Sequence, residues 1–192
     1  MLDAMGSVPR HLFVRRHLQS QAYGDFALPS ESSQTISQPY IVAKMTELLE
    51  LDKSHTVLEI GTGTGYQTAI LAVLAARVYS LERVAGLAQQ AISRIRELGF
   101  HNVKIQDFDG TTGWSAAAPF DRILVTAGAP VVPKPLLEQL NPGGLMVIPE
   151  GDRQSQRLVK YRKLRSSGYQ RHEGEAVTFV PLVGRHGWAE EA

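Results

Sequence analysis

The most constraining feature of this sequence is a run of glycines directly after a short apolar segment. Residues 56–60 are β-branched and apolar apart from Glu59, which predicts a buried strand. Gly61, Gly63 and Gly65 follow, and glycines at a strand end let the backbone turn sharply and approach a ligand without side-chain collision. In a sheet of parallel strands such a turn lies at the carboxyl edge, where ligands bind.

Strand-like and helix-like segments alternate after this turn. The predicted helices are residues 66–74, 84–98 and 135–140, and the predicted strands are 78–82, 102–106, 120–126 and 145–148. Repeated strand–helix–strand units indicate an α/β fold with a doubly wound, mostly parallel sheet and helices on both faces. The alternation of strands and helices stops after residue 155, because predicted strands at 156–164 and 170–182 flank a turn at 166–168 without a convincing helix. They predict an antiparallel C-terminal edge.

The 192 residues suit a single domain with a sizeable core. We divide it into an N-terminal segment that covers substrate and cofactor (1–54), a cofactor-binding core (55–150) and C-terminal antiparallel strands (151–192). The first part contains a predicted helix at 41–51, preceded by a loop at 23–39 that is rich in Ser, Gln and Pro. A bound ligand is one reason for such a loop to be ordered.

Charge and composition exclude several function classes. The 20 basic and 19 acidic residues nearly balance, whereas a nucleic-acid partner requires a clustered basic excess. The basic run at 153–165 is interpreted as a solvated face of a strand pair. No cysteine is present, which excludes disulfides and thiolate chemistry, and the six histidines show no metal-ligand spacing, so no metal is assigned.

No apolar run reaches the roughly 18 residues of a membrane span, and the first residues do not form a secretory signal. We therefore expect a cytoplasmic monomer with no membrane partner.

The spacing of the glycines separates two kinds of nucleotide site. A dinucleotide site requires G-x-G-x-x-G, but here the third glycine comes one residue early. Glu59 stands two residues before the first glycine and would repel a pyrophosphate. The same acid favours a cationic ligand, such as the ammonium or sulfonium of S-adenosylmethionine.

Two further acids stand at the carboxyl ends of the next two predicted strands: Glu82 is the last residue of its strand, and Asp109 follows its strand. Glu82 can accept both hydrogen bonds of a ribose diol; the alternative is a solvated glutamate paired with Arg83 or Arg77. Asp109, followed by Gly110, can accept a hydrogen bond from the adenine amino group; the alternative is an ordinary Asp-Gly turn.

Several motifs together resemble the protein-L-isoaspartate O-methyltransferase family over nearly the whole chain. The string from Val57 to Thr68 resembles the first motif of class I methyltransferases in general. The more specific stretches are Val8-Pro9-Arg10-His11-Leu12-Phe13-Val14, Gln34-Thr35-Ile36-Ser37-Gln38-Pro39-Tyr40, Asp109-Gly110-Thr111-Thr112-Gly113-Trp114, Ala118-Pro119-Phe120-Asp121 with Val125-Thr126-Ala127, and Phe179-Val180-Pro181-Leu182.

The resemblance implies repair of damaged proteins or peptides by methyl transfer from S-adenosylmethionine to the carboxylate of L-isoaspartyl residues. It places the active-site serine on Ser37 and the substrate contacts on Thr35, Ile36 and Ser37. The implied cofactor contacts are Glu59, Gly61, Thr62, Gly63, Gly65, Tyr66, Glu82, Arg83, Asp109, Gly110 and Thr126.

The chemistry is consistent with a serine that orients rather than attacks. A carboxylate is already an anion at neutral pH, so its methylation needs no strong base. The Ser37 hydroxyl can hold such a group by donating a hydrogen bond. No Gly-x-Ser-x-Gly elbow surrounds it. The alternative is that Ser37 caps the helix that starts near Pro39.

Three departures from the family pattern leave other functions open. Residues 30–33 replace glycines of the family, Phe108 replaces the first glycine of a Gly-Asp-Gly motif, and the family's extra N-terminal helix is missing or lies upstream of Met1. A paralogue that methylates another carboxylate or a small molecule, and a non-catalytic cofactor-binding module, are the alternative functions. An NAD-dependent oxidoreductase is disfavoured by the glycine spacing.

Overall fold

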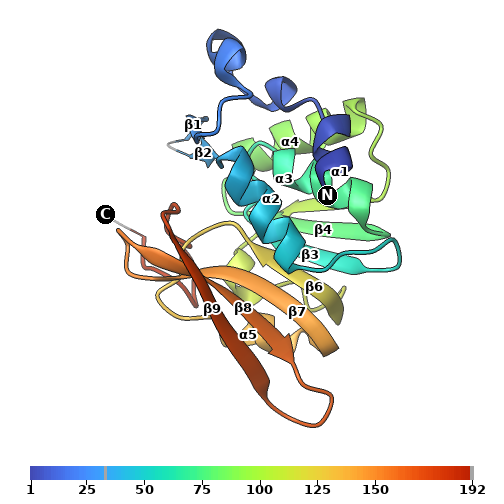
Figure 1. Cartoon of the computed structure of the whole chain (residues 1–192), viewed down its shortest axis with the longest axis vertical. Coiled ribbons are helices and arrows are strands. Elements are labelled where there is room, and N and C mark those ends of the chain that lie inside the picture. Colours follow the sequence, from blue (N-terminus) through green and yellow to red (C-terminus); the bar gives the residue numbers. More distant parts are fainter. Residues whose placement is uncertain (33, 191–192) are drawn as a thin grey trace.

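The computed structural model describes residues 1–32 and 34–190 and is built around one seven-stranded sheet (Figure 1). The strand order is β5-β4-β3-β6-β7-β8-β9. The strands are β3 (Thr56–Ile60), β4 (Arg77–Glu82), β5 (Val103–Asp107), β6 (Phe120–Val125), β7 (Leu140–Gly151), β8 (Gln156–Lys163) and β9 (Tyr169–Val177). Neighbours from β5 to β7 run parallel, whereas β8 and β9 are antiparallel additions. The predicted fold class is thereby confirmed.

Helices and short turns surround this sheet. The α-helices are α1 (Leu2–Ser7), α2 (Pro39–Leu48), α3 (Tyr66–Leu74), α4 (Ala85–Glu97) and α5 (Lys134–Glu138). Three 3-10 helices are η1 (Arg10–Phe13), η2 (Arg16–Gln21) and η3 (Gly110–Thr112), and β1 (Leu28–Pro29) pairs with β2 (Thr35–Ile36) in a separate small sheet. Within the described residues, no helix has the length and apolar character needed to cross a membrane.

The two faces of the sheet bury different helices. Val57 and Leu124 belong to a cluster with Met45 of α2 and Leu71 of α3. On the other face, alternate strand residues such as Leu58 and Ile123 pack with Leu136 of α5. This alternation is the period-two pattern of strands buried on both faces.

The order of the strands creates a ligand crevice at one edge. From β3 the chain moves outward through β4 and β5, and then returns to β6 on the other side of β3. The carboxyl ends of β3 and β6 therefore border a topological switch point. The glycine turn that begins at Gly61 lies there.

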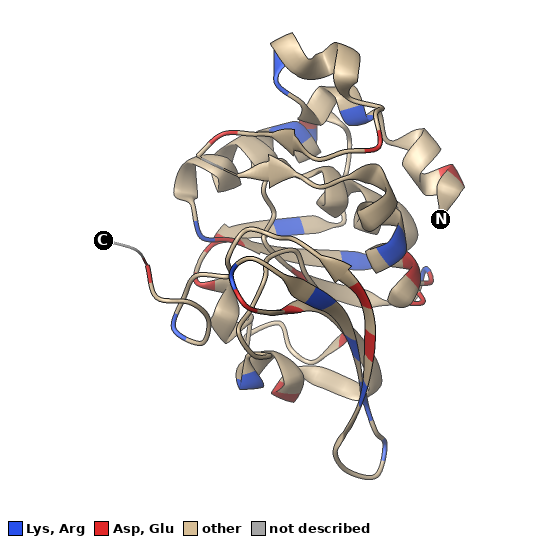
Figure 2. Cartoon of the chain, turned by 60° about the vertical axis from the view of Figure 1, so that its left-hand side comes forward, with Lys and Arg blue, Asp and Glu red and all other residues tan. Residues whose placement is uncertain are grey.

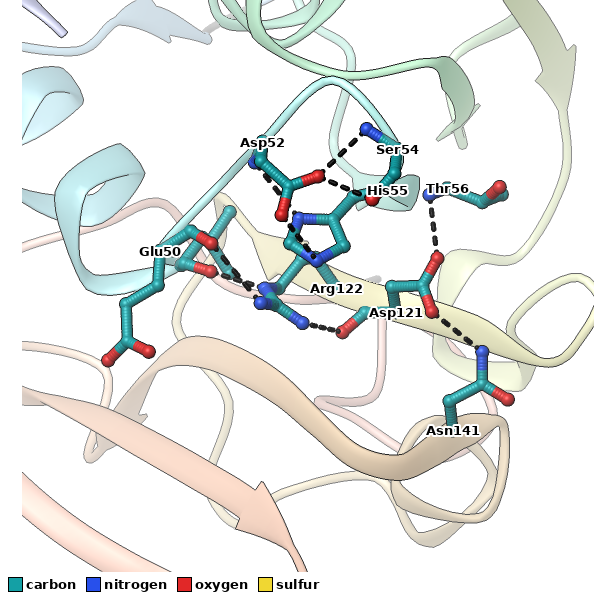
Figure 3. Close-up of polar contacts among 9 residues, drawn as sticks. Glu50, Asp52, Ser54, His55, Thr56, Asp121, Arg122 and Asn141 are labelled. Carbon is teal, nitrogen blue, oxygen red and sulfur yellow. Dashed lines mark hydrogen bonds and ion pairs between the residues drawn. The ribbon is translucent and has the colours of Figure 1, made fainter.

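A polar network secures the opposite edge of the sheet (Figure 3). The Asp121 carboxylate accepts hydrogen bonds from the Thr56 N–H and the Asn141 side chain, both at 2.8 Å. Arg122 donates to the backbone carbonyls of Leu49 and Glu50. The starts of β3, β6 and β7 and the end of α2 are thus joined, and the carboxyl edge remains for a ligand.

Strand β7 is longer than the predicted 145–148, and α5 ends before the predicted residue 140. Phe120 pairs with Leu140 and Arg122 pairs with Leu145, so residues 141–144 lie opposite Asp121 alone. This bulge accommodates Pro142, which has no N–H for the ladder. The helix-breaking residues therefore interrupt the pairing locally without ending the strand.

Charged residues are interspersed along the ribbon (Figure 2). The basic run is only partly solvated, in contrast to the sequence interpretation. The Lys160 ammonium and the Arg162 guanidinium both form ion pairs with the Glu50 carboxylate, at 2.5 and 3.2 Å, and the Lys160 side chain is only 18% exposed. These two cations fix β8 to the end of α2.

Candidate functional site

A cavity of about 200 Å³ lies at the carboxyl edge of the sheet. Its walls come mainly from the loop before α2, the glycine turn after β3, the end of β4 and residues 179–183, with further residues from α2, η3 and the segment that follows β6. Apolar side chains such as Ile60 and Leu81 alternate in it with the polar side chains of Thr62 and Glu82. A mixed wall of this kind suits a ligand with both an aromatic ring and polar groups.

The glycine turn exposes backbone to this cavity. Gly61, Gly63 and Gly65 have φ values of +94°, +54° and +88°, which side-chain-bearing residues rarely adopt. A Cβ on Gly61 would collide with the Thr126 hydroxyl oxygen. That hydroxyl lies 2.6 Å from the Gly61 carbonyl oxygen and donates to it. The turn is therefore shaped jointly by the ends of β3 and β6.

Glu82 is buried in the cavity wall and is bound by the backbone. Its two carboxylate oxygens accept the N–H groups of Gly63 at 2.8 Å and Val84 at 3.0 Å. Arg83 instead forms an ion pair with Glu190 at 2.7 Å, and Arg77 donates to Tyr79, so the solvated-glutamate alternative is wrong. Each oxygen keeps a lone pair with which it can accept a ribose hydroxyl.

Glu59 lies beneath the glycine turn, outside the residues that line the cavity. One oxygen accepts hydrogen bonds from Thr68 and Ser80, both at 2.6 Å, and the other has no partner among the described residues. Burial raises the pKa of Glu59 to about 7, although the two hydroxyls oppose the shift. The Ser80 hydroxyl oxygen also lies 2.6 Å from the hydroxyl oxygen of Thr62, and this hydrogen bond links the Glu59 carboxyl group to the cavity wall.

Asp109 holds two later segments together, and its neighbour Gly110 lines the cavity. One Asp109 oxygen accepts from the N–H and hydroxyl of Thr111, and the other accepts from the Arg185 N–H at 2.8 Å. These bonds match the turn interpretation and also tie the closing segment to η3. An adenine contact by Asp109 stays a prediction.

The loop before α2 brings Thr35, Ile36 and Ser37 to the same cavity. Ile36 is buried, and Ser37 is partly exposed. The N-cap of α2 is Gln38, without a side-chain cap, and the Asp25 carboxylate accepts the Tyr40 N–H at 3.0 Å. Ser37 does not cap this helix, so that alternative is wrong and its hydroxyl is available at the cavity.

Tyr66 begins α3 as part of the cavity wall and is almost completely buried. The Arg10 guanidinium lies 4.9 Å from the centre of its ring, and the Phe13 ring meets it edge-on at 5.4 Å. Two residues of the family-like N-terminal motif thus support the turn from outside the cavity. Arg83 also lines the cavity, with its guanidinium directed to Glu190.

The altered loop and the Phe108 departure lie at the margin of the site. Phe108 is 51% exposed and is not a wall residue. Glu31 accepts a hydrogen bond from Gln90, and the Ser30 carbonyl accepts one from Arg15. Ser33 lies outside the described residues.

Sequence reasoning missed several wall residues. They are Gln34, Val42, Met45, Gln67, Leu81, Val84 and Phe179 to Val183. The Phe179-Val180-Pro181-Leu182 motif was a signal for the last group, since it matched the family without receiving a role. The apolar residues of α2 gave no such signal, because any buried helix carries them.

Comparison with known proteins gives consistent matches over almost the whole chain. The family model described as "Protein-L-isoaspartate(D-aspartate) O-methyltransferase (PCMT)" matches residues 1–187. A protein-L-isoaspartate O-methyltransferase of Trichlorobacter lovleyi is 53% identical over 188 residues, covering 98% of this chain and 87% of the relative. One from Geobacter metallireducens is 52% identical over 191 residues, covering 100% and 88%.

Solved structures agree with this likeness. A protein-L-isoaspartate O-methyltransferase aligns with a TM-score of 0.83 and 28% identity, over 96% of this chain and 62% of that one. A putative enzyme of the same name from Plasmodium falciparum, in complex with S-adenosyl-L-homocysteine, aligns with a TM-score of 0.82 and 24% identity, over 94% and 88%. The second match concerns the fold alone.

Proposed function

The chain belongs to the protein-L-isoaspartate(D-aspartate) O-methyltransferase family and is an S-adenosylmethionine-dependent enzyme of protein repair, and we propose that Ser37 holds the acceptor carboxylate. The group methylated is the carboxylate of L-isoaspartyl residues in damaged proteins or peptides. The proposal for Ser37 is supported by one observation. Thr35, Ile36 and Ser37 share a single cavity with the glycine turn and Glu82.

The residues around that cavity fit S-adenosylmethionine. The Glu82 oxygens can accept the ribose hydroxyls while they keep their backbone partners, and the space beside Gly63 is open, since a Cβ there would meet nothing within 4 Å. The cofactor supplies a methyl group on a positively charged sulfur. Thr126 keeps the turn in the shape that admits this ligand. Glu59 lies beneath the turn and outside the cavity wall, and its negatively charged form predominates only above about pH 7.

Ser37 has the chemistry of an orienting donor. Its hydroxyl can donate a hydrogen bond to an anionic carboxylate oxygen without removing a proton. A direct displacement requires the attacking oxygen, the methyl carbon and the sulfur in line, with the reacting atoms roughly 3–3.5 Å apart. A hydroxyl at the cavity wall supports that alignment. We assign Thr35 and Ile36 to the positioning of the peptide around it.

Two peptides test this function directly. They have the same residues and differ only in one linkage, isoaspartyl in the first and normal aspartyl in the second. With methyl-labelled S-adenosylmethionine, label is expected on the isoaspartyl peptide alone. Label on neither peptide, with cofactor still bound, would instead support a paralogue with another acceptor or a binding module.

We also propose that the enzyme works as a monomer in the cytoplasm, without nucleic acid or membrane partners. The near balance of 20 basic and 19 acidic residues supports the lack of a nucleic-acid partner. The lack of cysteine is compatible with a reducing compartment. Light scattering of the purified protein tests the oligomeric state.

A further inference from the structure

A second cavity, of about 400 Å³, lies beside the cofactor cavity. Thr35, Ser37 and Phe179 belong to the walls of both, so the two cavities meet at the proposed acceptor position. The remaining walls come mainly from the start of α2, with Ile41, and from the end of β9, with Ala176. A chain that places one carboxylate at Ser37 therefore has room for a neighbouring residue in the second cavity.

One side-chain contact joins the two walls of this second cavity. The Tyr40 hydroxyl lies 3.2 and 3.3 Å from the two carboxylate oxygens of Glu175 and donates to them. Tyr40 precedes the wall residue Ile41, and Glu175 precedes the wall residue Ala176. The hydrogen bond with Glu175 raises the pKa of Tyr40, so the hydroxyl remains a donor at neutral pH. Neither Tyr40 nor Glu175 is itself a wall residue, so their contact holds a carboxylate next to the wall, at a position that we call the rim.

A second acid, Asp25, lies close to Tyr40. The Asp25 carboxylate accepts hydrogen bonds from the Gln38 side chain and the Tyr40 N–H, both at 3.0 Å. Within the described part of the chain, no ion pair joins Asp25 or Glu175 to a lysine or arginine. Asp25 also interacts electrostatically with the buried guanidinium of Arg10. Among the described residues, Glu175 is therefore the carboxylate of this pair that has no cationic partner.

We propose that Tyr40 and Glu175 are specificity-determining residues, which favour isoaspartyl peptides with a basic or uncharged side chain next to the isoaspartyl residue over those with an acidic one. The second cavity receives that neighbouring residue, and Glu175 at the rim attracts a cation and repels an anion. This inference rests on the proposed function, because the isoaspartyl residue itself must lie at Ser37. An exposed charge pair is worth about two- to fivefold in kcat/KM.

The test uses isoaspartyl peptides that differ at one position. Lys, Ala or Glu is placed directly after the isoaspartyl residue in one set and directly before it in another. We expect the wild type to prefer Lys over Glu in at least one set by about two- to fivefold in kcat/KM. Glu175→Gln should bring that ratio close to one. Tyr40→Phe, which frees the carboxylate but keeps the ring, should lower it partway.

Glu173→Gln is the matched control. It removes the same charge from the same strand, but Glu173 pairs with Arg157 and Arg171, both at 2.9 Å. Its Lys-to-Glu ratio should equal that of the wild type. An unchanged ratio in Glu175→Gln, or an equal change in both variants, would overturn the inference. If no isoaspartyl peptide accepts a methyl group, the proposed function fails instead; normal methylation of the Ala peptides separates the two outcomes.

Discussion

Thr126 and Gly61 determine each other's place at the carboxyl edge of the sheet. The Thr126 hydroxyl donates to the Gly61 carbonyl at 2.6 Å, and the same oxygen occupies the space that a Gly61 side chain would need. The bond spans the ends of two parallel strands that are far apart in the sequence. The shape of the glycine turn therefore depends on the absence of a side chain at Gly61 and on the hydroxyl group of Thr126.

Gly61→Ala should abolish most of the rise in melting temperature that S-adenosylmethionine produces, because the added methyl group must displace Thr126. Gly99→Ala is the control, since Gly99 also has a positive φ, of +79°, but a Cβ there meets nothing within 4 Å. Gly99→Ala should lower the free energy of unfolding by about 1 kcal/mol and keep the rise in melting temperature that S-adenosylmethionine produces. Equal responses in the two variants would contradict the role of the Gly61–Thr126 contact.

Glu82→Ala should weaken S-adenosylmethionine binding by about 10- to 100-fold, because hydrogen bonds to a charged group are each worth about 1.5–3 kcal/mol. The variant also removes the acceptor for the Gly63 N–H. Titration calorimetry measures the affinity. Glu97→Ala, at an exposed position of α4, should bind as the wild type does. An unaltered affinity in Glu82→Ala would exclude it from the ribose site.

Ser37→Ala should lower turnover of the isoaspartyl peptide by about tenfold, the value of one or two hydrogen bonds in the transition state. The affinity for the cofactor should change less than about twofold, since the cofactor contacts lie on the other wall. Steady-state kinetics and calorimetry measure the two effects. Ser166→Ala, in the exposed β8–β9 turn, serves as control. Parallel losses of turnover and cofactor affinity would argue against an orienting role.

The buried Glu59 should make stability depend on pH. Burial raises its pKa from 4.5 to about 7, so the folded chain keeps a proton that the unfolded chain releases in this window. The resulting stabilisation is complete below about pH 4.5 and is lost as the pH rises through about 7. Glu59→Gln does not titrate, so its stability relative to the wild type should rise by on the order of 3 kcal/mol across that window.

Urea unfolding of both proteins at several pH values between 5 and 8 measures this difference. Glu97→Gln provides a charge-matched comparison at an exposed site. A constant difference between wild type and Glu59→Gln at every pH would mean that the carboxyl group titrates normally in the folded state.

Local pattern was sufficient to predict the centre of the fold. The strand at 56–60 and the helix at 66–74 have the predicted bounds, because a buried apolar run and the glycines that end it are adjacent in the sequence. The extent of β7 was missed. Its continuation across Pro142 depends on the bulge opposite Asp121, which is a property of the neighbouring strand.

Side-chain partners were the least predictable part of the site. Glu82 was predicted to accept the ribose hydroxyls, and that role stays a prediction; its bond to the Gly63 N–H depends on how far the turn folds back, which the sequence does not specify. The bond between Asp109 and the Arg185 N–H joins segments with no shared pattern. The contact of Tyr40 with Glu175 likewise exists only because β9 is added beside α2. Such contacts follow from tertiary packing, which sequence periodicity does not specify.

Residues 179–183 complete the wall around the cofactor cavity, and Asp109 anchors the segment that follows them. A ribosome delivers the chain from its amino end, so Gly61 and Glu82 emerge while this wall is still unmade. We therefore expect the nascent chain to bind its methyl donor weakly until translation has passed β9. Shortened products that lack the closing segment should then not compete for the donor.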